Sequence, residues 1–192
     1  MDTSTAVPLT HSNYILATGE KASERLRLLN EIFGPGTREL LRLAGLSPGM
    51  AVADIGCGTG LVSQWIAGAV APHGSVTAVD VSSEQLQIGE EKAMAAGLKN
   101  VRFQTSDAYQ TGLPGESFDL VYSRFLMCHL TEPIKALDEM RRLLKPGGIL
   151  VCEDHDVGGI FTEPQTRAYK RLVEISEAVN ASRGLDSYVG LN

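Results

Sequence analysis

The stretch AVADIGCGTG, residues 51–60, decides the fold of this chain. A short apolar run reaches Asp54, and Gly56, Gly58 and Gly60 follow at alternate positions before the next apolar segment. Glycine adopts a positive φ at little steric cost, so three of them permit a tight turn whose backbone comes close to a ligand. The turn also aims the free N–H groups at the start of a helix into the same space. The pattern therefore predicts a strand, a glycine turn and a helix that together hold a ligand.

The spacing of these glycines distinguishes two kinds of binding loop. A dinucleotide-binding loop has its third glycine five residues after the first, and here that position is Leu61. This chain has the pattern D-x-G-x-G-x-G instead, with Asp54 two residues before the first glycine. At these residues it resembles the S-adenosylmethionine-dependent methyltransferases of the Rossmann-like class. Plain strand-to-helix turns use similar glycines, so the prediction also depends on the motifs downstream.

The second strand is predicted over Val76 to Val79 and ends at Asp80, 20 residues beyond Gly60. A carboxylate at this place can accept hydrogen bonds from the two adjacent hydroxyls of an adenosine ribose. The alternative is that Asp80 only caps the helix that follows. The residues Ser82-Ser83-Glu84 supply an N-cap and an early acid for that helix, which is predicted to run to about Ala96.

The third strand, Val101 to Thr105, leads to Asp107 and Ala108. In the family that this chain resembles, an acid here accepts from the adenine amino group and the next backbone N–H meets the ring. A turn-capping role for Asp107 is the alternative.

Two more motifs complete the resemblance. The run over Phe118 to Ser123 is similar to the family's F-D-x-V strand, whose end passes the methionine part of the cofactor. Arg124 follows it, and this residue either meets the cofactor carboxylate or pairs with a surface acid. The run LKPGGIL, residues 144–150, then leads into a fifth strand over Ile149 to Cys152 and is another family hallmark.

The resemblance implies S-adenosylmethionine as the cofactor, held by residues from all these segments and by one near the N-terminus. The implied cofactor-binding residues are Tyr14, Asp54, Gly56, Cys57, Gly58, Gly60, Asp80, Val81, Asp107, Ala108, Ser123 and Arg124.

Five strands with helices between them predict an α/β, doubly wound, mostly parallel sheet in the order 3-2-1-4-5. A last helix is predicted over Glu163 to Val179, and only residues 183–192 remain after it. The family usually closes its sheet with two further strands, and these do not fit there. We therefore expect a shortened chain, a natural fragment, or a homo-oligomer in which a partner covers the open sheet edge.

In the family that this chain resembles, N-terminal helices lie over the cofactor as a lid. The resemblance therefore implies a helical lid over residues 1–46, ahead of a cofactor-binding domain over residues 47–192. Leu26, Leu29 and Phe33 recur at helical spacing, and Gly34-Pro35-Gly36 is expected to break the segment into two short helices. Tyr14 lies at the entrance of this lid in the predicted arrangement, or else it is part of the core.

The composition of the chain indicates which classes of binding partner and which cell compartment to expect. The chain of 192 residues has a formal net charge of −6, which argues against a nucleic-acid or anionic membrane surface and favours a small-molecule substrate. Three cysteines, Cys57, Cys128 and Cys152, lie far apart and form no C-x-x-C pair. The start Met1-Asp2-Thr3 has neither a basic nor an apolar leader segment. These features predict a cytoplasmic protein.

Candidate proton acceptors follow the fifth strand. His155 either pairs with a neighbouring acid at the surface or acts as a base with help from Asp154 or Glu153, because histidine titrates near neutral pH. His129 either orders its own loop or acts as a base. Two acids beside a histidine also suggest a metal site, but metal-dependent members of the family need acids after the fourth strand. Here Ser123-Arg124 occupy that place, so no metal is expected.

Three functions remain open from the sequence. The resemblance favours S-adenosylmethionine-dependent methyl transfer to an oxygen, nitrogen or carbon nucleophile of a small molecule. A dinucleotide-dependent oxidoreductase is the second possibility, and the position of Leu61 argues against it. A non-catalytic cofactor-binding or assembly module is the third.

Overall fold

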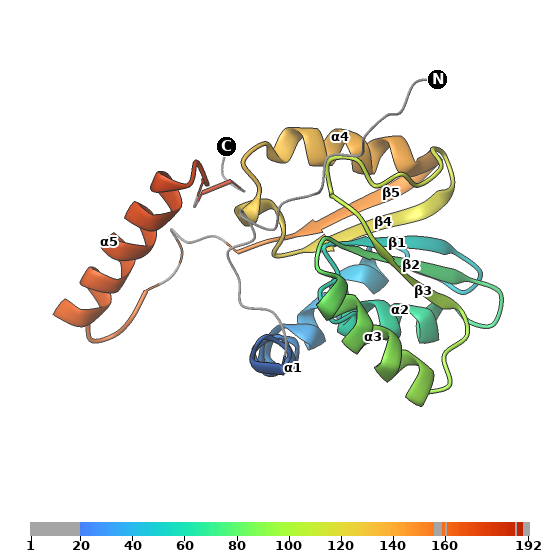
Figure 1. Cartoon of the computed structure of the whole chain (residues 1–192), viewed down its shortest axis with the longest axis horizontal. Coiled ribbons are helices and arrows are strands. Elements are labelled where there is room, and N and C mark those ends of the chain that lie inside the picture. Colours follow the sequence, from blue (N-terminus) through green and yellow to red (C-terminus); the bar gives the residue numbers. More distant parts are fainter. Residues whose placement is uncertain (1–19, 156–158, 160, 187, 190–192) are drawn as a thin grey trace, which may run out of the picture.

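The computed structural model describes residues 20–155, 159, 161–186 and 188–189. Its centre is a five-stranded, all-parallel sheet in the order β3-β2-β1-β4-β5 (Figure 1). This order confirms the topology predicted from the alternation of strands and helices. The strands are β1 (Ala51–Ile55), β2 (Ser75–Asp80), β3 (Val101–Thr105), β4 (Phe118–Arg124) and β5 (Leu144–Glu153).

Helices cover both faces of the sheet. Figure 1 shows α4 on one face and α2 and α3 on the other, with α1 beside α2. A helix follows each of the first two strands, as right-handed crossovers between parallel strands require. The helices are α1 (Glu20–Leu43), α2 (Leu61–Val70), α3 (Ser83–Ala95), the short 3-10 helix η2 (Met127–His129), α4 (Pro133–Leu143) and α5 (Arg167–Ser182).

Alternating side chains of the strands build one core on each face. Val52 of β1 packs with Ile66 of α2, whereas its neighbour Ala53 packs with Met140 of α4. All four residues have no exposed surface. Fully burying an aliphatic side chain stabilises a fold by about 1.5–3 kcal/mol, so these two layers hold β1 rigidly at the centre of the molecule.

Helix α1 differs from its prediction. The sequence predicted two short helices broken at Gly34-Pro35-Gly36, and the structure has one continuous helix with Pro35 inside it. Proline in a helix removes one backbone hydrogen bond, at a cost of roughly 3 kcal/mol. Thr37 and Leu41, which are completely buried, anchor the segment after the proline against the body of the protein. These contacts, which the local sequence does not reveal, keep the chain helical through Pro35.

Two other boundaries were wrong. Helix α5 begins at Arg167 and not at Glu163, because the Thr166 side chain accepts a hydrogen bond from the backbone N–H of Tyr169 and caps the helix there. Strand β5 begins at Leu144, so it includes the Lys-Pro-Gly-Gly segment that was expected to precede it, and its register with β4 shifts between Phe118 and Leu120.

The first helix of the described chain packs into this core, whereas the last helix does not. Leu41 of α1 lies in the same core as β1 and α2. In contrast, α5 has no buried residue and stands apart from the sheet (Figure 1). Within the described ranges, β5 pairs only with β4. The division at residues 46 and 47, the sheet's lack of two further strands and the homo-oligomer remain predictions.

Candidate functional site

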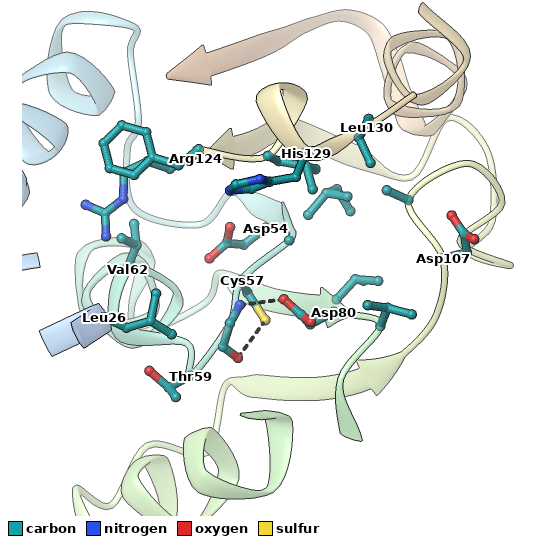
Figure 2. A pocket seen from close by; sticks show the side chains of 18 of the residues that line it. Leu26, Asp54, Cys57, Thr59, Val62, Asp80, Asp107, Arg124, His129 and Leu130 are labelled. Carbon is teal, nitrogen blue, oxygen red and sulfur yellow. Dashed lines mark hydrogen bonds between the residues drawn. The ribbon is translucent and has the colours of Figure 1, made fainter. Parts of the chain in front are cut away.

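A cavity of about 740 Å³ opens at the carboxyl ends of the central strands (Figure 2). Its walls come from the loop after β1, the start of α2, the ends of β2 and β4, the loop after β3, η2 and the first half of α1. Ser182 and Arg183, at the end of α5, also line it. The chain runs from β1 outward to β3 and then returns to β4 on the other side of β1. Ligands bind at such a reversal in open α/β sheets, so the topology marks this cavity as the candidate site.

Glycines shape the turn under the cavity. Gly56, Gly58 and Gly60 have φ values of 74°, 55° and 65°. The backbone N–H groups of Gly56 and Cys57 both donate to the carbonyl oxygen of Val79, at 2.8 and 3.0 Å. Gly56, Cys57 and Gly58, three of the residues that the resemblance implies for cofactor binding, line the cavity.

Gly60 contributes to packing and not to the cavity lining. It precedes the first residue of α2, and a Cβ added there would lie 2.5 Å from the Phe103 ring. It is buried and is not among the residues that line the cavity. A side chain at this position would clash with the Phe103 ring, and the φ of 65° is one that residues with a Cβ rarely adopt, so glycine suits this position for structural reasons.

Asp80 connects the glycine turn to the second strand. Its carboxylate accepts hydrogen bonds from the backbone N–H of Gly58 at 2.7 Å and of Ser82 at 2.9 Å. The side chain of Ser82, and not Asp80, caps α3 by accepting from Gln85 N–H. Burial raises the pKa of Asp80, and the backbone hydrogen bonds act in the opposite direction. Two hydrogen bonds leave further lone pairs of this carboxylate available to a ligand in the cavity that it lines.

Asp54, which also lines the cavity, is almost fully buried at the end of β1. The Ser63 hydroxyl donates to its carboxylate at 2.5 Å. Burial raises the pKa of Asp54 to about 6, the hydrogen bond from Ser63 and the charge of Arg124 act against this rise, and the nearby Asp80 adds to it. A cation in the cavity would therefore be attracted to an ionised Asp54.

The loop after β3 forms the far wall of the cavity. Asp107 accepts a hydrogen bond from the backbone N–H of Tyr109 at 2.8 Å, so the turn-capping geometry weighed from the sequence is present. Asp107 and Ala108 also line the cavity, as does Val81. The cap and a ligand contact are therefore compatible, because the carboxylate has a second oxygen.

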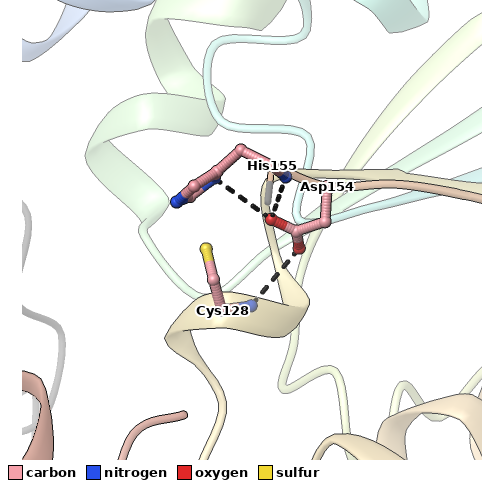
Figure 3. A group of neighbouring side chains, drawn as sticks. All are labelled: Cys128, Asp154 and His155. Atoms are coloured by element: carbon pink, nitrogen blue, oxygen red, sulfur yellow. Dashed lines mark hydrogen bonds and ion pairs between the residues drawn. The ribbon is translucent and has the colours of Figure 1, made fainter. Parts of the chain in front are cut away.

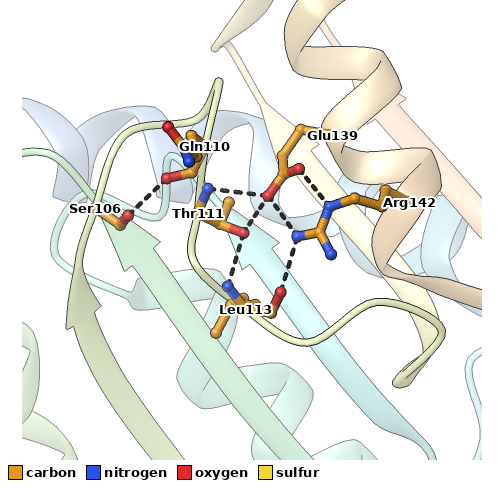
Figure 4. Close-up of polar contacts among 6 residues, drawn as sticks. All are labelled: Ser106, Gln110, Thr111, Leu113, Glu139 and Arg142. Carbon is orange, nitrogen blue, oxygen red and sulfur yellow. Dashed lines mark hydrogen bonds and ion pairs between the residues drawn. The ribbon is translucent and has the colours of Figure 1, made fainter.

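Side chains of helix α4 form hydrogen bonds with the loop after β3, on the side away from the cavity (Figure 4). Glu139 accepts from both the backbone N–H and the hydroxyl of Thr111, at 2.9 and 2.5 Å, and Arg142 donates to both oxygens of Glu139. Arg142 also donates to the carbonyl oxygen of Leu113 at 2.8 Å. These bonds hold the wall that carries Asp107 against the body of the protein.

Arg124 extends from the end of β4 towards α1. It lines the cavity and donates to the Thr37 hydroxyl at 3.0 Å and to Asn30 Oδ1 at 3.2 Å. The surface ion pair weighed from the sequence is not formed with any described acid. Its neighbour Ser123 is buried and is not part of the cavity lining.

Glu153 has a different environment from the one the sequence suggested. It accepts hydrogen bonds from the Thr37 hydroxyl at 2.8 and 2.9 Å and from the Tyr122 hydroxyl at 2.7 Å. The carboxylate therefore anchors α1 to β4 and β5. Glu153 does not line the cavity, so it is not placed to help a base there.

The two candidate histidines are separated by the structure. His129 of η2 lines the cavity, whereas His155 does not (Figure 2). Burial lowers the pKa of His129, the charge of Asp154 opposes this shift, and His155 and Arg25 add smaller contributions that lower the pKa further. His155 instead pairs with Asp154 at 3.3 Å. A neutral imidazole thus faces the cavity at position 129.

Several lining residues were not predicted. Arg25, Leu26 and Leu29 of α1 and Phe125 line the cavity, and the only sequence signal was the apolar stripe of α1. Thr59 also lines it, and the buried hydroxyl of this residue has no hydrogen-bond partner in the described part of the chain. Such a group is available to a ligand. Tyr14 lies outside the described residues.

No helix among the described residues combines the length and the hydropathy that a membrane span needs.

Comparisons with known proteins point to one family. Residues 53–152, more than half of the chain, match the family described as "Methyltransferase domain". A demethylmenaquinone methyltransferase from Geobacillus stearothermophilus is 36% identical over 115 residues, which are 60% of this chain and 49% of the relative. The chain spans about half the length of the curated relatives it matches.

Solved structures share the fold. A SAM-dependent methyltransferase from Aquifex aeolicus superposes with a TM-score of 0.58 and 29% identity, over 73% of this chain and 77% of that one. The cyclase SpnF superposes with a TM-score of 0.56 and 31% identity, over 70% of this chain and 46% of the cyclase. Since one of these neighbours is a cyclase, the fold alone does not fix the reaction, and the residues in the cavity must decide it.

Proposed function

This chain belongs to the methyltransferase domain family, and on that premise we propose that its cavity binds S-adenosylmethionine and directs the methyl group to a small-molecule nucleophile. The observation that carries the proposal is the buried carboxylate of Asp80, which faces the cavity at the end of β2 and is joined to the glycine turn through Gly58. A fixed carboxylate beside a glycine turn matches the two adjacent hydroxyls of a ribose.

The residues of the cavity suit the remaining parts of this cofactor. In the proposed complex, the loop of Asp107 and Ala108 holds the adenine, and the glycine turn lies against the amino-acid end. An ionised Asp54 favours the cofactor's positive charge. Arg124, whose described partners are neutral, offers a positive group to the cofactor's carboxylate. The unpartnered Thr59 hydroxyl provides one further hydrogen bond.

When bound, the cofactor would supply an electrophilic methyl group on a sulfonium, and its transfer to the acceptor's nucleophile would leave the carbon–sulfur electron pair on sulfur. The chain contributes mainly position. Leu26, Leu29 and Phe125 form apolar walls that exclude water and align the two reactants. Correct alignment of two reactants can supply several kcal/mol of the rate acceleration.

An acceptor that carries a proton on its nucleophile must also lose it. Among the described residues, His129 is the histidine that lines the cavity, and its lowered pKa keeps the imidazole neutral at pH 7. A neutral imidazole can accept that proton, so in this proposal His129 replaces His155 as the base. Such a base typically contributes 100-fold or more to the rate.

Binding experiments separate the proposed cofactor from a dinucleotide. In calorimetric titrations of the full chain, we expect S-adenosylmethionine and S-adenosylhomocysteine to bind and NAD and NADP not to bind. Asp80→Asn should weaken the binding at least tenfold. The control is Asp138→Asn, a change on the exposed surface of α4, which should leave the affinity unchanged. Tighter binding of a dinucleotide would favour the oxidoreductase instead.

Product formation separates an enzyme from a non-catalytic module. The name of the relatives makes demethylmenaquinone the first acceptor to test, with mass spectrometry detecting the added methyl group. His129→Ala should lower the turnover about a hundredfold and leave the affinity for S-adenosylhomocysteine nearly unchanged, because His129 is not among the residues proposed above to hold the cofactor. Equal turnover by this variant would contradict the role of His129. Cofactor binding without any methylated product would favour the non-catalytic module.

A further inference from the structure

Three side chains converge at a place outside the cavity. Cys128 of η2 points towards Asp154 and His155, which follow β5 (Figure 3). Each offers one ligand atom, and the sulfur, the carboxylate oxygen and the imidazole nitrogen all lie within 4.8 Å of one another. A thiol, an imidazole and a carboxylate are the ligand types that Zn²⁺ binds in proteins.

Backbone groups hold the central carboxylate in place. Asp154 Oδ2 accepts from the backbone N–H of Cys128 at 3.3 Å, and Oδ1 accepts from the backbone N–H of His155 at 2.9 Å. The imidazole Nδ1 of His155 lies 3.3 Å from the same Oδ1. The carboxylate thus sits between the other two ligands, and hydrogen bonds to a ligating carboxylate are the kind of support that tunes metal sites.

The accessibility of the three groups suits an ion that arrives from solvent. Cys128 is 6% exposed, the Asp154 side chain is 12% exposed and the His155 side chain is 39% exposed. An ion can therefore enter past His155 and reach the sulfur behind it. His155 also packs edge-on against Phe125, with 5.7 Å between the ring centroids, and this contact limits where its ring can lie.

We propose that Cys128, Asp154 and His155 form a binding site for a thiophilic divalent cation of the Zn²⁺ type. The sulfur excludes Mg²⁺ and Ca²⁺ as the preferred ions, since both favour oxygen ligands. Three protein ligands leave the fourth tetrahedral position to water. On binding, the Cys128 sulfur gives its proton to solvent and forms the metal–sulfur bond, so nothing is oxidised or reduced. The proposal does not depend on methyl transfer.

The sequence did not predict this site for two reasons. The expectation that no metal binds was argued from Ser123-Arg124 after the fourth strand, and the cluster lies elsewhere. Cys128 also precedes Asp154 by 26 residues, a separation that matches no spacing rule for metal ligands. Glu153, which the sequence grouped with Asp154 and His155, points instead to Thr37 and Tyr122.

Cobalt substitution tests the proposal on the full chain. Titration with Co²⁺ should produce the near-ultraviolet thiolate-to-cobalt charge-transfer band and the visible bands of a tetrahedral ion, both saturating at one ion per chain. Zn²⁺ should then abolish them by displacement. Cys128→Ser should remove the charge-transfer band, and His155→Ala should weaken the affinity at least tenfold. The matched control is Cys152→Ser, which removes an exposed thiol of β5 and should bind cobalt as the unchanged chain does.

The result that would overturn the proposal is the absence of a charge-transfer band in the unchanged chain, or an equal band in Cys128→Ser. Retained affinity for S-adenosylhomocysteine, or an unchanged circular dichroism spectrum, shows that a variant is folded. If Cys128→Ser does not fold, the metal affinity of His155→Ala tests the proposal alone. The His155 side chain is partly exposed, so its removal should leave the fold intact. Unchanged metal affinity in this variant would also overturn the site.

Discussion

Asp54 lies almost fully buried at the end of β1, and this burial raises the pKa of its carboxyl to about 6, against an ordinary value of 3.8. A raised pKa means that the folded state prefers the protonated acid. The free energy of unfolding therefore falls as the pH rises from about 4 to above 6, by up to about 3 kcal/mol in total. At neutral pH, the ionised carboxylate of Asp54 therefore lowers the free energy of unfolding.

Asp54→Asn should remove that cost. We expect the free energy of unfolding at pH 7.5 to rise by on the order of 1–3 kcal/mol, and its decrease between pH 4 and 7 to become flatter. Urea titrations at several pH values measure both effects. A variant that is less stable than the unchanged chain at pH 7.5 would show that Asp54 stabilises the fold as an anion.

The same residue should couple binding to pH. A cofactor with positive charge favours the ionised Asp54, so at pH 5 binding must first remove a proton from the carboxyl. We expect the affinity for S-adenosylhomocysteine, which has an ammonium group, to fall as the pH drops below about 6. Calorimetry on Asp54→Asn should show at least tenfold weaker binding with this pH dependence lost. A variant that is more stable but binds less well is typical of a functional site.

Glu139 carries a stabilising charge behind the loop of Asp107 (Figure 4). The hydrogen bonds from Arg142, followed by those from Thr111, lower its pKa to about 2 from an ordinary 4.5. The stability it contributes is complete above pH 4.5 and is lost as the pH falls towards 2. Glu139→Gln should lower the free energy of unfolding at pH 7 by about 1–3 kcal/mol in urea titrations.

A variant of the neighbouring residue Asp138 serves as the control for loss of an exposed ion pair. Asp138→Asn removes an ion pair whose two side chains are 79% and 62% exposed, so it should cost well under 1 kcal/mol. Equal losses in Asp138→Asn and Glu139→Gln would contradict the assignment of a structural role to the Glu139 network.

At the scale of elements, α1 is the part whose docking matters most to the site. Thr37 donates to Glu153 and accepts from Arg124, and Ser23 accepts from Lys92 of α3 at 3.1 Å. Thr37→Val keeps the shape of the side chain but leaves Glu153 with one hydrogen bond fewer. We expect a loss of about 1–3 kcal/mol in stability and faster amide hydrogen exchange in α1. Glu39→Gln, on the exposed side of the same helix, should change neither.

Elements with a strong local signal could be predicted from the sequence, and those fixed by distant contacts could not. The bounds of β3 follow from its apolar run and flanking turns, and the structure has them as expected. Helix α1 was wrong because Pro35 is a strong local breaker, and the buried Thr37 that outweighs it acts through a residue 116 positions away. The start of α5 depended on the Thr166 cap, which the sequence contained and the prediction overlooked.

At the scale of the whole molecule, the place of the cavity beside the glycine turn could be predicted from the sequence, whereas the choice of histidine that lines it could not. The glycine turn and Asp80 are local patterns tied to one topology, and the cavity lies where that topology places it. The choice between His129 and His155 depends on how η2 and the end of β5 pack. No spacing encodes that packing, so only the structure separates the two residues.

The account is tested most directly by a crystal structure of the full chain with S-adenosylhomocysteine. It predicts that the ribose hydroxyls lie within hydrogen-bond distance of the Asp80 carboxylate, with the adenine against Asp107 and Ala108 and the amino-acid end over the turn at Gly56 to Gly58. A ligand bound outside this cavity, or one whose ribose does not contact Asp80, would contradict the central claim.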